Sequence, residues 1–262
     1  MMKSLSLFVF ACAVVVLGSN VASAVLVPAV IYSETFDTPA TGAANVSAAY
    51  PDYILSTPSG TDANVASGRL ELVKPIDTAM SFLSSQTFLN EPLTVSADLG
   101  ASSAAGGGND AVGLVIGNRA FLLFTDNGTL RYSLDTTSAN YMGQQNVGFG
   151  PGNLVRDAMH HMEVVVTPNG GAADFLITVT NGVSPGQSYT LPSYFDPGFV
   201  PGPVGFFNIY STTNTGLYDN LQVIGLVEFI APAPEPSSML LWGMGALVLV
   251  RARRRQRALA MA

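Results

Sequence analysis

Short apolar runs rich in β-branched and aromatic residues recur along the middle of the chain, and Gly, Ser, Thr, Asn and Pro separate them. Apolar and polar residues alternate in many of these runs, as in strands with one face on a core and the other in solvent. Amphipathic helices with 3.6-residue spacing and caps are not evident, which excludes an alternating βαβ fold. The pattern predicts strands at Ile31–Phe36, Gly68–Val73, Ala79–Phe88, Leu93–Leu99, Ala111–Ile116, Ala120–Phe124, Thr129–Leu134, His161–Val166, Asp174–Thr180, Val204–Tyr210 and Leu217–Ile224.

Turn residues stand between neighbouring runs. Asp126-Asn127-Gly128 and Asn169-Gly170-Gly171 each separate two apolar runs, which predicts two β-hairpins. Gly100–Asp110 and Phe195–Pro203 are predicted as a loop and a stiff irregular connection, because one lacks large side chains and the other holds three prolines. Many short strands joined in this way predict an all-β, two-sheet antiparallel sandwich of the jelly-roll type.

Residues 1–24 have the pattern of a secretion signal. Lys3 precedes an apolar stretch from Leu5 to Leu17, and Ala22-Ser23-Ala24 ends the segment. The apolar stretch is shorter than the roughly 20 residues that a membrane span needs. We therefore predict a signal helix that signal peptidase removes after Ala24, with Ala22 and Ala24 as the small residues at the cleavage site. A permanent anchor is the alternative, against which Pro28 and the polar sequence after it argue.

The composition bears on how the mature chain is stabilised and on which partners it can bind. The only cysteine, Cys12, lies inside the signal, so the mature chain must rely on a packed core or bound ions rather than disulfides. The formal net charge is −7, and most of the basic residues lie at the two ends, so the body between them is far more acidic than this value. An acidic surface repels phosphate backbones, so nucleic acid is excluded as a partner.

The C-terminal end combines a Pro-rich segment, an apolar segment and a basic cluster. Pro234-Glu235-Pro236 is followed by apolar residues from Met239 to Val250. Arg251, Arg253, Arg254 and Arg255 come next, and such a cluster stops a chain on the cytoplasmic side of a membrane. We expect a short apolar helix that is held briefly in the inner membrane, with Pro234, Glu235 and Pro236 just outside it.

This order of parts resembles the PEP-CTERM sorting domain. The resemblance implies an exosortase-type enzyme as partner and delivery to the cell surface or extracellular matrix of a Gram-negative bacterium, often alongside exopolysaccharide. A plain anchor that is never processed is the alternative. The expected division is therefore signal peptide 1–24, β-sandwich 25–230 and sorting tail 231–262.

The body resembles the concanavalin-like, laminin-G-like jelly-roll group. Ser33–Asp37 opens the domain as such modules open, and Ala158–Val164 has a His-His pair before alternating valines. Gly205-Phe206-Phe207 and Gly216–Val223 are similar to the closing hairpin of the group. Met159 stands where tryptophan is usual, and the group spans lectins, glycosidases and structural modules.

No catalytic pattern is convincing. The paired carboxylates of related glycosidases are not found, since Glu71 and Glu163 stand alone on their strands. No Gly-x-Ser-x-Gly elbow occurs either. His160 and His161 are adjacent on a strand and face opposite sides, so they cannot readily share one zinc ion. We predict that the protein is not an enzyme.

The resemblance suggests one cofactor, a structural calcium ion. In β-sandwich carbohydrate-binding modules, carboxylates of the first and last strands hold such an ion, and Glu34, Asp37 and Asp219 lie on those strands here. The alternative is that Asp219-Asn220 forms a β-bulge or turn and that Glu34 is solvated.

Tyr141 and Tyr194 are the aromatic residues in loop-like surroundings, where a ring can stack on a sugar. The predicted function is a non-catalytic secreted surface or matrix protein with weak carbohydrate binding. A secreted polysaccharide hydrolase and an ice-binding or adhesive surface protein are the alternatives. The expected partners are the secretion machinery, signal peptidase, an exosortase-type enzyme, the inner membrane and exopolysaccharide.

Overall fold

The computed structural model describes residues 24–56, 61–74, 79–88, 91–103, 111–124, 129–135, 143–146, 158–184, 186–209 and 214–230. The chain divides into two units. One compact unit runs from Pro28 to Val227. The other comprises residues 1–27 and 228–262, of which the described residues are the outer ends of the first and last strands.

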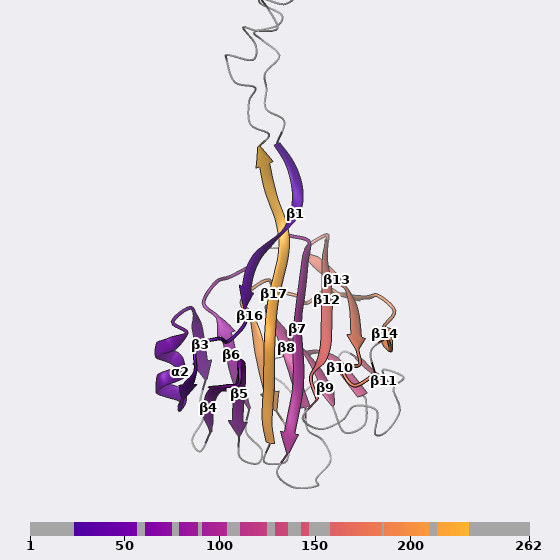
Figure 1. The fold of residues 1–262 in the computed structure, drawn as a ribbon. Coiled ribbons are helices and arrows are strands. Elements are labelled where there is room, and N and C mark those ends of the chain that lie inside the picture. Colours follow the sequence, from indigo (N-terminus) through magenta and orange to yellow (C-terminus); the bar gives the residue numbers. More distant parts are fainter. Residues whose placement is uncertain are drawn as a thin grey trace, which may run out of the picture. The chain divides into compact units, whose positions relative to one another are not determined.

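Two sheets form the compact unit (Figure 1). Sheet A has β1 (Ala24–Glu34) paired with β17 and β15 (Tyr194–Asp196) paired with β13. Its main path is β14 (Ser188–Thr190), β13 (Ala172–Thr180), β12 (His160–Asn169), β7 (Leu93–Ser103), β17 (Asn214–Ile230), β5 (Arg69–Lys74), β4 (Asp62–Ala66) and β2 (Ala40–Thr41). The last described strand, β17, therefore lies inside the sheet rather than at its edge.

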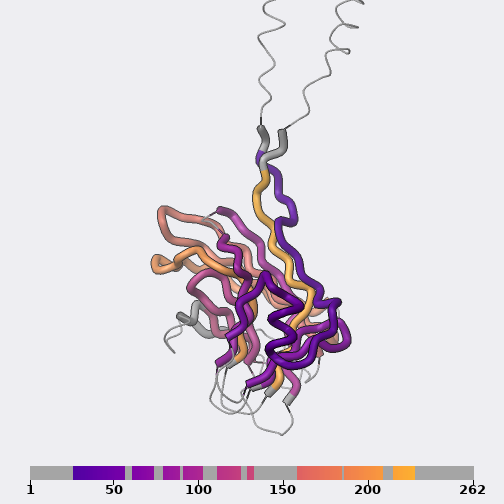
Figure 2. The backbone as a smooth tube through the Cα atoms, turned by 90° about the vertical axis from the view of Figure 1, so that its left-hand side faces the viewer, coloured from indigo at the N-terminus to yellow at the C-terminus, as the bar shows by residue number. Residues whose placement is uncertain are grey.

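Sheet B is continuous and antiparallel. Its order is β11 (Gly143–Asn146), β10 (Thr129–Asp135), β9 (Arg119–Phe124), β8 (Ala111–Ile116), β16 (Val204–Ile209), β6 (Met80–Ser84) and β3 (Tyr53–Ser56). Figure 2 shows the chain turned by 90°, with β1 in indigo beside β17 in yellow, as in Figure 1. The first and last strands of the body are therefore neighbours.

The core lies between the two sheets and consists of alternate residues of each strand. Phe82 and Phe206 of sheet B and Tyr218 of sheet A are fully buried, and Phe36 contacts both phenylalanine rings. Burying side chains of this size contributes about 1.5–3 kcal/mol each before the entropy of ordering them is counted. In β8 and β9 both faces are buried, which matches their near-continuous apolar sequences.

Two buried hydrogen bonds connect the sheets through this core. The Tyr218 hydroxyl donates to the Phe207 carbonyl at 2.9 Å. The Asn208 amide Nδ2 donates to the Leu72 carbonyl at 2.8 Å. Both acceptors are backbone carbonyls, so each hydrogen bond links a side chain of one sheet to the backbone of the other.

The structure confirms the two-sheet sandwich, and every strand predicted from the pattern corresponds to a strand. Apart from the short strands β2, β3, β4, β11 and β14, which the pattern did not predict, it differs from the sequence analysis in three places. The helix α2 (Ala43–Ala49) was not predicted, because it has seven residues and Val46 is its one buried side chain. Gly100–Ser103, predicted as loop, continue β7, where Gly100 and Ala101 are buried. Phe195 and Asp196, predicted as connection, belong to β15. The expected terminal helices lie outside the described residues.

Candidate functional site

A β-bulge in β17 places two polar side chains side by side on the outer face of sheet A. The pairing of β17 with β7 shifts between Asp219 and Gln222. Tyr218 and Leu221 on either side are buried, while Asp219 is half-buried and Asn220 is exposed. Asn220 has φ 52°, a left-handed conformation that asparagine tolerates better than most residues. The extra residue thus presents Asp219 and Asn220 together without turning the next core residues outward.

Asp98 of β7 joins this bulge to β12. Its Oδ2 accepts a hydrogen bond from Asn220 Nδ2 at 2.7 Å, and its Oδ1 lies 2.8 Å from His161 Nδ1. The register explains the contact, because Asp98 is the cross-strand partner of both His161 and Asp219. We call Asp98, His161, Asp219 and Asn220 the outer-face cluster.

The cluster is electrostatically polarised. The hydrogen bond to Asp98 raises the pKa of His161 above its ordinary value, against the opposing effect of burial, and the charges of Asp98 and Glu163 add to the rise. The same hydrogen bond lowers the pKa of Asp98. Burial raises the pKa of Asp219, and the charges of Asp98 and Asp37 act in the same direction. The hydrogen bond thus favours the protonated form of His161 and the ionised form of Asp98, whereas burial disfavours the ionised form of Asp219.

The cluster offers hydrogen-bonding groups more readily than a catalytic centre. A histidine oriented by a carboxylate can act as a base when a hydroxyl lies against its other nitrogen. Thr180 is the cross-strand neighbour of His161, but its hydroxyl pairs with that of Ser188 at 2.9 Å. Among the described residues, no hydroxyl is hydrogen-bonded to His161, and Ser96 on the same face of β7 is buried. The exposed cluster therefore suits recognition of a polar ligand such as a polyol.

His160 and His161 face opposite sides of sheet A, as the alternation of a strand requires. His160 is fully buried and its Nδ1 accepts from the Gly182 amide at 3.2 Å, whereas His161 lies on the outer face. The pair does not share one ligand, and His160 has a structural role.

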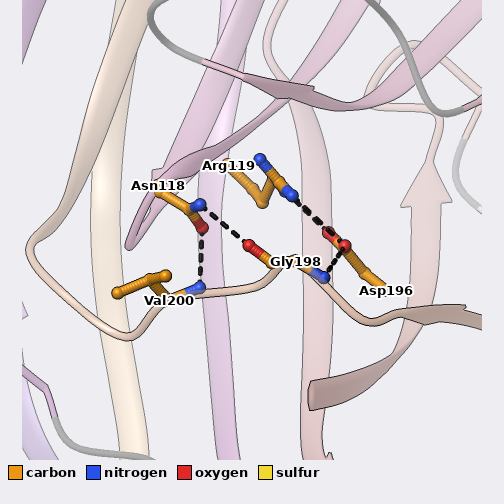
Figure 3. A network of polar contacts seen from close by, with 5 residues as sticks. All are labelled: Asn118, Arg119, Asp196, Gly198 and Val200. Atoms are coloured by element: carbon orange, nitrogen blue, oxygen red, sulfur yellow. Dashed lines mark hydrogen bonds and ion pairs between the residues drawn. The ribbon is translucent and has the colours of Figure 1, made fainter. Parts of the chain in front are cut away.

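A second polar network lies near the β8–β9 turn (Figure 3), and within it only Arg119 and Asp196 are buried. Arg119 forms an ion pair with Asp196 at 2.6 Å, and the Gly198 amide also donates to this carboxylate. Asn118 donates to the Gly198 carbonyl and accepts from the Val200 amide. The network fastens the irregular segment after β15 to sheet B, so it positions a loop rather than a ligand.

The structure does not gather the predicted calcium ligands into a metal site. Glu34 Oε1 accepts from the backbone amides of Thr35 and Phe36, and Asp37 accepts from the Thr35 hydroxyl. Asp219 accepts from the amide of Asn220 in the bulge. In the described part of the chain, no group of three or more His, Cys, Asp or Glu residues is arranged to hold a metal ion. Calcium takes six to eight oxygen ligands, so calcium binding by Glu34, Asp37 and Asp219 stays a prediction.

Tyr194 lies against the core instead of presenting a free ring. It is half-buried, stacks on Phe175 with centroids 5.3 Å apart, and contacts Tyr132. Ligand stacking by Tyr194 stays a prediction, and Tyr141 lies outside the described residues. The pattern missed Asp98 as a site residue, because no local signal connects it with residues 63 and 122 positions away.

The processing residues are mostly outside the described part of the chain. Ala24 is the first residue of β1, while Ala22, Pro234, Glu235, Pro236 and the arginines from Arg251 to Arg255 are not described. None of the described helices is long and apolar enough to span a membrane.

Comparison with known proteins identifies the C-terminal end. Residues 232–255 match the PEP-CTERM protein-sorting motif. A comparison with curated protein sequences finds no match.

Several solved structures resemble the chain. Peanut lectin matches with a TM-score of 0.52 and 10% identity, over 78% of this chain and 99% of the lectin. Arcelin-5, a lectin-like defence protein from Phaseolus vulgaris, matches with a TM-score of 0.50 and 12% identity, over 68% and 93%. Lectin I from Ulex europaeus, in complex with the methyl glycoside of α-L-fucose, matches with a TM-score of 0.50 and 10% identity, over 66% and 91%. At such identities the likeness establishes the fold, a lectin-like, concanavalin-like sandwich.

Proposed function

We propose that this chain, a lectin-like sandwich followed by a PEP-CTERM sorting motif, is a non-catalytic protein of the cell surface or extracellular matrix that binds carbohydrate. The observation that carries the proposal is the position of the motif at residues 232–255, directly after the last strand, which ends at Ile230. The motif implies export and processing by an exosortase-type enzyme. The body is then the part that acts outside the cell.

Export requires a signal at the other end of the chain. The charged, apolar and small-residue order of residues 1–24 supplies one, and β1 begins at the proposed cleavage residue Ala24. Signal peptidase and the secretion machinery are the partners at this step. The apolar segment from Met239 and the arginines behind it would then hold the chain transiently in the inner membrane.

Carbohydrate is the favoured ligand for two reasons. One solved structure of the same fold is a lectin in complex with a fucoside. The outer-face cluster also combines a carboxylate, an amide and an imidazole, which together accept and donate hydrogen bonds to hydroxyl groups. The acidic body favours neutral or cationic glycans over anionic ones, because like charges repel.

Binding without cleavage is favoured over hydrolysis. Catalysis of hydrolysis by His161 would need a hydroxyl nucleophile hydrogen-bonded to its ring. Among the described residues no hydroxyl has this position, since the Thr180 hydroxyl pairs with Ser188. The hydroxyl pairs Thr178–Thr190 and Thr180–Ser188 form a small array, but Glu163 and His161 continue their rows. An extended threonine surface of the ice-binding kind is therefore interrupted at β12.

A glycan array probed with the full chain in mild detergent tests the proposal. We expect binding to neutral or amine-bearing glycans, and up to about tenfold weaker binding for Asn220→Ala, since a lost neutral hydrogen bond costs up to about 1.5 kcal/mol. Glu71→Gln, on the same face but paired with Arg69, is the matched control and should bind normally. Release of reducing sugar from a bound polysaccharide would favour the hydrolase instead, and an array without any binding would reject the carbohydrate proposal.

A further inference from the structure

The last described strand, β17, connects two halves of sheet A. β17 is hydrogen-bonded to β7 through residues Asn214–Ile224 and to β5 through Asn214–Tyr218, and β1 also pairs with it. Without β17 the sheet would separate into β14-β13-β12-β7 and β5-β4-β2. β1, the first strand of the body, would have lost its partner as well.

β17 also supplies the centre of the core. Tyr218, Leu221 and Val223 belong to the core between the sheets and are each at most 1% exposed. Tyr218 carries a hydrogen bond to sheet B, and Asn220 one to Asp98 of β7. Strands β7 and β5 would present open edges, and sheet B an uncovered apolar face, until this strand is in place.

The sorting motif begins two residues beyond this strand. β17 ends at Ile230 and the motif starts at residue 232. Residues 231–238 separate the strand from the apolar segment at Met239, and eight residues span at most about 30 Å. A chain exported from its N-terminus therefore delivers β17 and the sorting motif almost together, after the other strands have left the membrane.

We propose that β17 is a closing strand: as the last described strand to be exported, it completes the sandwich when the sorting motif reaches the membrane, and it needs no removal of the tail to do so. This inference rests on the export part of the proposed function. β17, which the tail follows directly, pairs with the open edges of β7 and β5. The sorting enzyme therefore meets a protein that has just completed its fold. An incomplete chain lacks both the motif and the strand, and stays open and sensitive to proteases.

Engineered disulfides can report the docking of β17, since the only natural cysteine, Cys12, lies in the signal. Ser96 and Gln222 are cross-strand partners on β7 and β17. Ser96 and Glu163 are partners on β7 and β12, two strands that leave the membrane earlier. The Ser96→Cys/Gln222→Cys variant reports closure, and the Ser96→Cys/Glu163→Cys variant is the matched control.

Both variants are exported from a Gram-negative host without a sorting enzyme, as the full chain and as chains ending after Ile230 or Thr213. We expect the closure disulfide in the full chain that retains Arg251–Arg257 and in the chain ending after Ile230. The chain ending after Thr213 should be degraded by added protease at least tenfold faster. The inference would be overturned if the closure disulfide formed only in the chain ending after Ile230. It would also be overturned if the chain ending after Thr213 resisted protease as well as the full chain does.

The control pair separates this inference from its premise. If the control disulfide forms and the closure disulfide does not, export stands and the closing strand is rejected. If neither disulfide forms in the full chain and the signal is still attached, the export proposal fails, and the inference that rests on it fails too.

Discussion

At the scale of single residues, Asp98 is the centre of the charged contacts on the outer face of sheet A. Asp98 is shared between His161 and Asn220, so one carboxylate links three strands. The ion pair with His161 is partly exposed, and exposed pairs contribute little, typically up to about 1 kcal/mol. Its effect should therefore be visible mainly as a dependence of stability on pH.

His161→Gln should change that dependence in a defined window. The pKa of His161 is raised in the folded state, so its contribution is complete below about pH 6.5 and is lost as pH rises through the raised value. The pKa of Asp98 is lowered, so its contribution is complete above about pH 4 and is lost on further acidification. Urea unfolding should show the variant less stable by up to about 1 kcal/mol at pH 5.5 and nearly equal to the wild type at pH 9. An equal difference at both values would contradict the assignment.

Asp196→Asn should be far more damaging, because Asp196 is fully buried and faces Arg119. Removing one partner leaves a buried charge uncompensated, at a cost of about 3–5 kcal/mol in the free energy of unfolding. Asp174→Asn changes a carboxylate that lies partly exposed on β13 and should cost under about 1 kcal/mol. Denaturant titration of both variants measures the difference, and similar small losses would show that the ion pair does not stabilise the fold.

At the scale of elements, the bulge in β17 determines which residues face the core. Deletion of Asn220 would remove the extra residue and turn Leu221 and Val223 toward the outer face. Since each lost core side chain costs about 2–5 kcal/mol, the deleted chain should be unfolded by circular dichroism and protease digestion. Asn220→Gly keeps the left-handed conformation and the register, so it should lose only about 1 kcal/mol. A folded deletion variant would mean that the bulge is dispensable.

At the scale of the whole molecule, the expected source of stability is the core between the sheets. The described carboxylates Glu34, Asp37 and Asp219 do not form a metal-binding group. Excess EDTA should therefore shift the melting temperature by less than about 1 °C, because an ion that does not bind the folded state cannot stabilise it. A lower melting temperature that added calcium restores would support the calcium site predicted from the sequence.

The sorting motif leads us to predict which residues the mature chain lacks. Protein recovered from the surface of a host with an exosortase-type enzyme should lack residues 1–24 and Arg251–Arg257. Intact-mass measurement decides this, and Glu235→Ala should leave the arginines attached. Mature surface protein that retains Arg251–Arg257 would support a plain anchor.

The strands were predictable where alternation or apolar runs were long, as in Leu93–Leu99 and His161–Val166. The short strands β2, β3, β4, β11, β14 and β15 were missed, because two to five residues carry too little periodicity. The outer-face cluster was missed for another reason. Asp98 is joined to His161 and Asn220 by register alone, across 63 and 122 residues.

The linear order of side chains was enough to determine the sandwich class, the acidic body and the C-terminal sorting motif, because these depend on local composition and periodicity. The signal at residues 1–24 stays a prediction. Only the tertiary structure decided that the last strand lies inside sheet A, that β1 pairs with it, and that Asp98 meets His161 and Asn220. These features arise from pairing between distant segments, and that pairing depends on which edges and apolar faces fit together once the chain is compact.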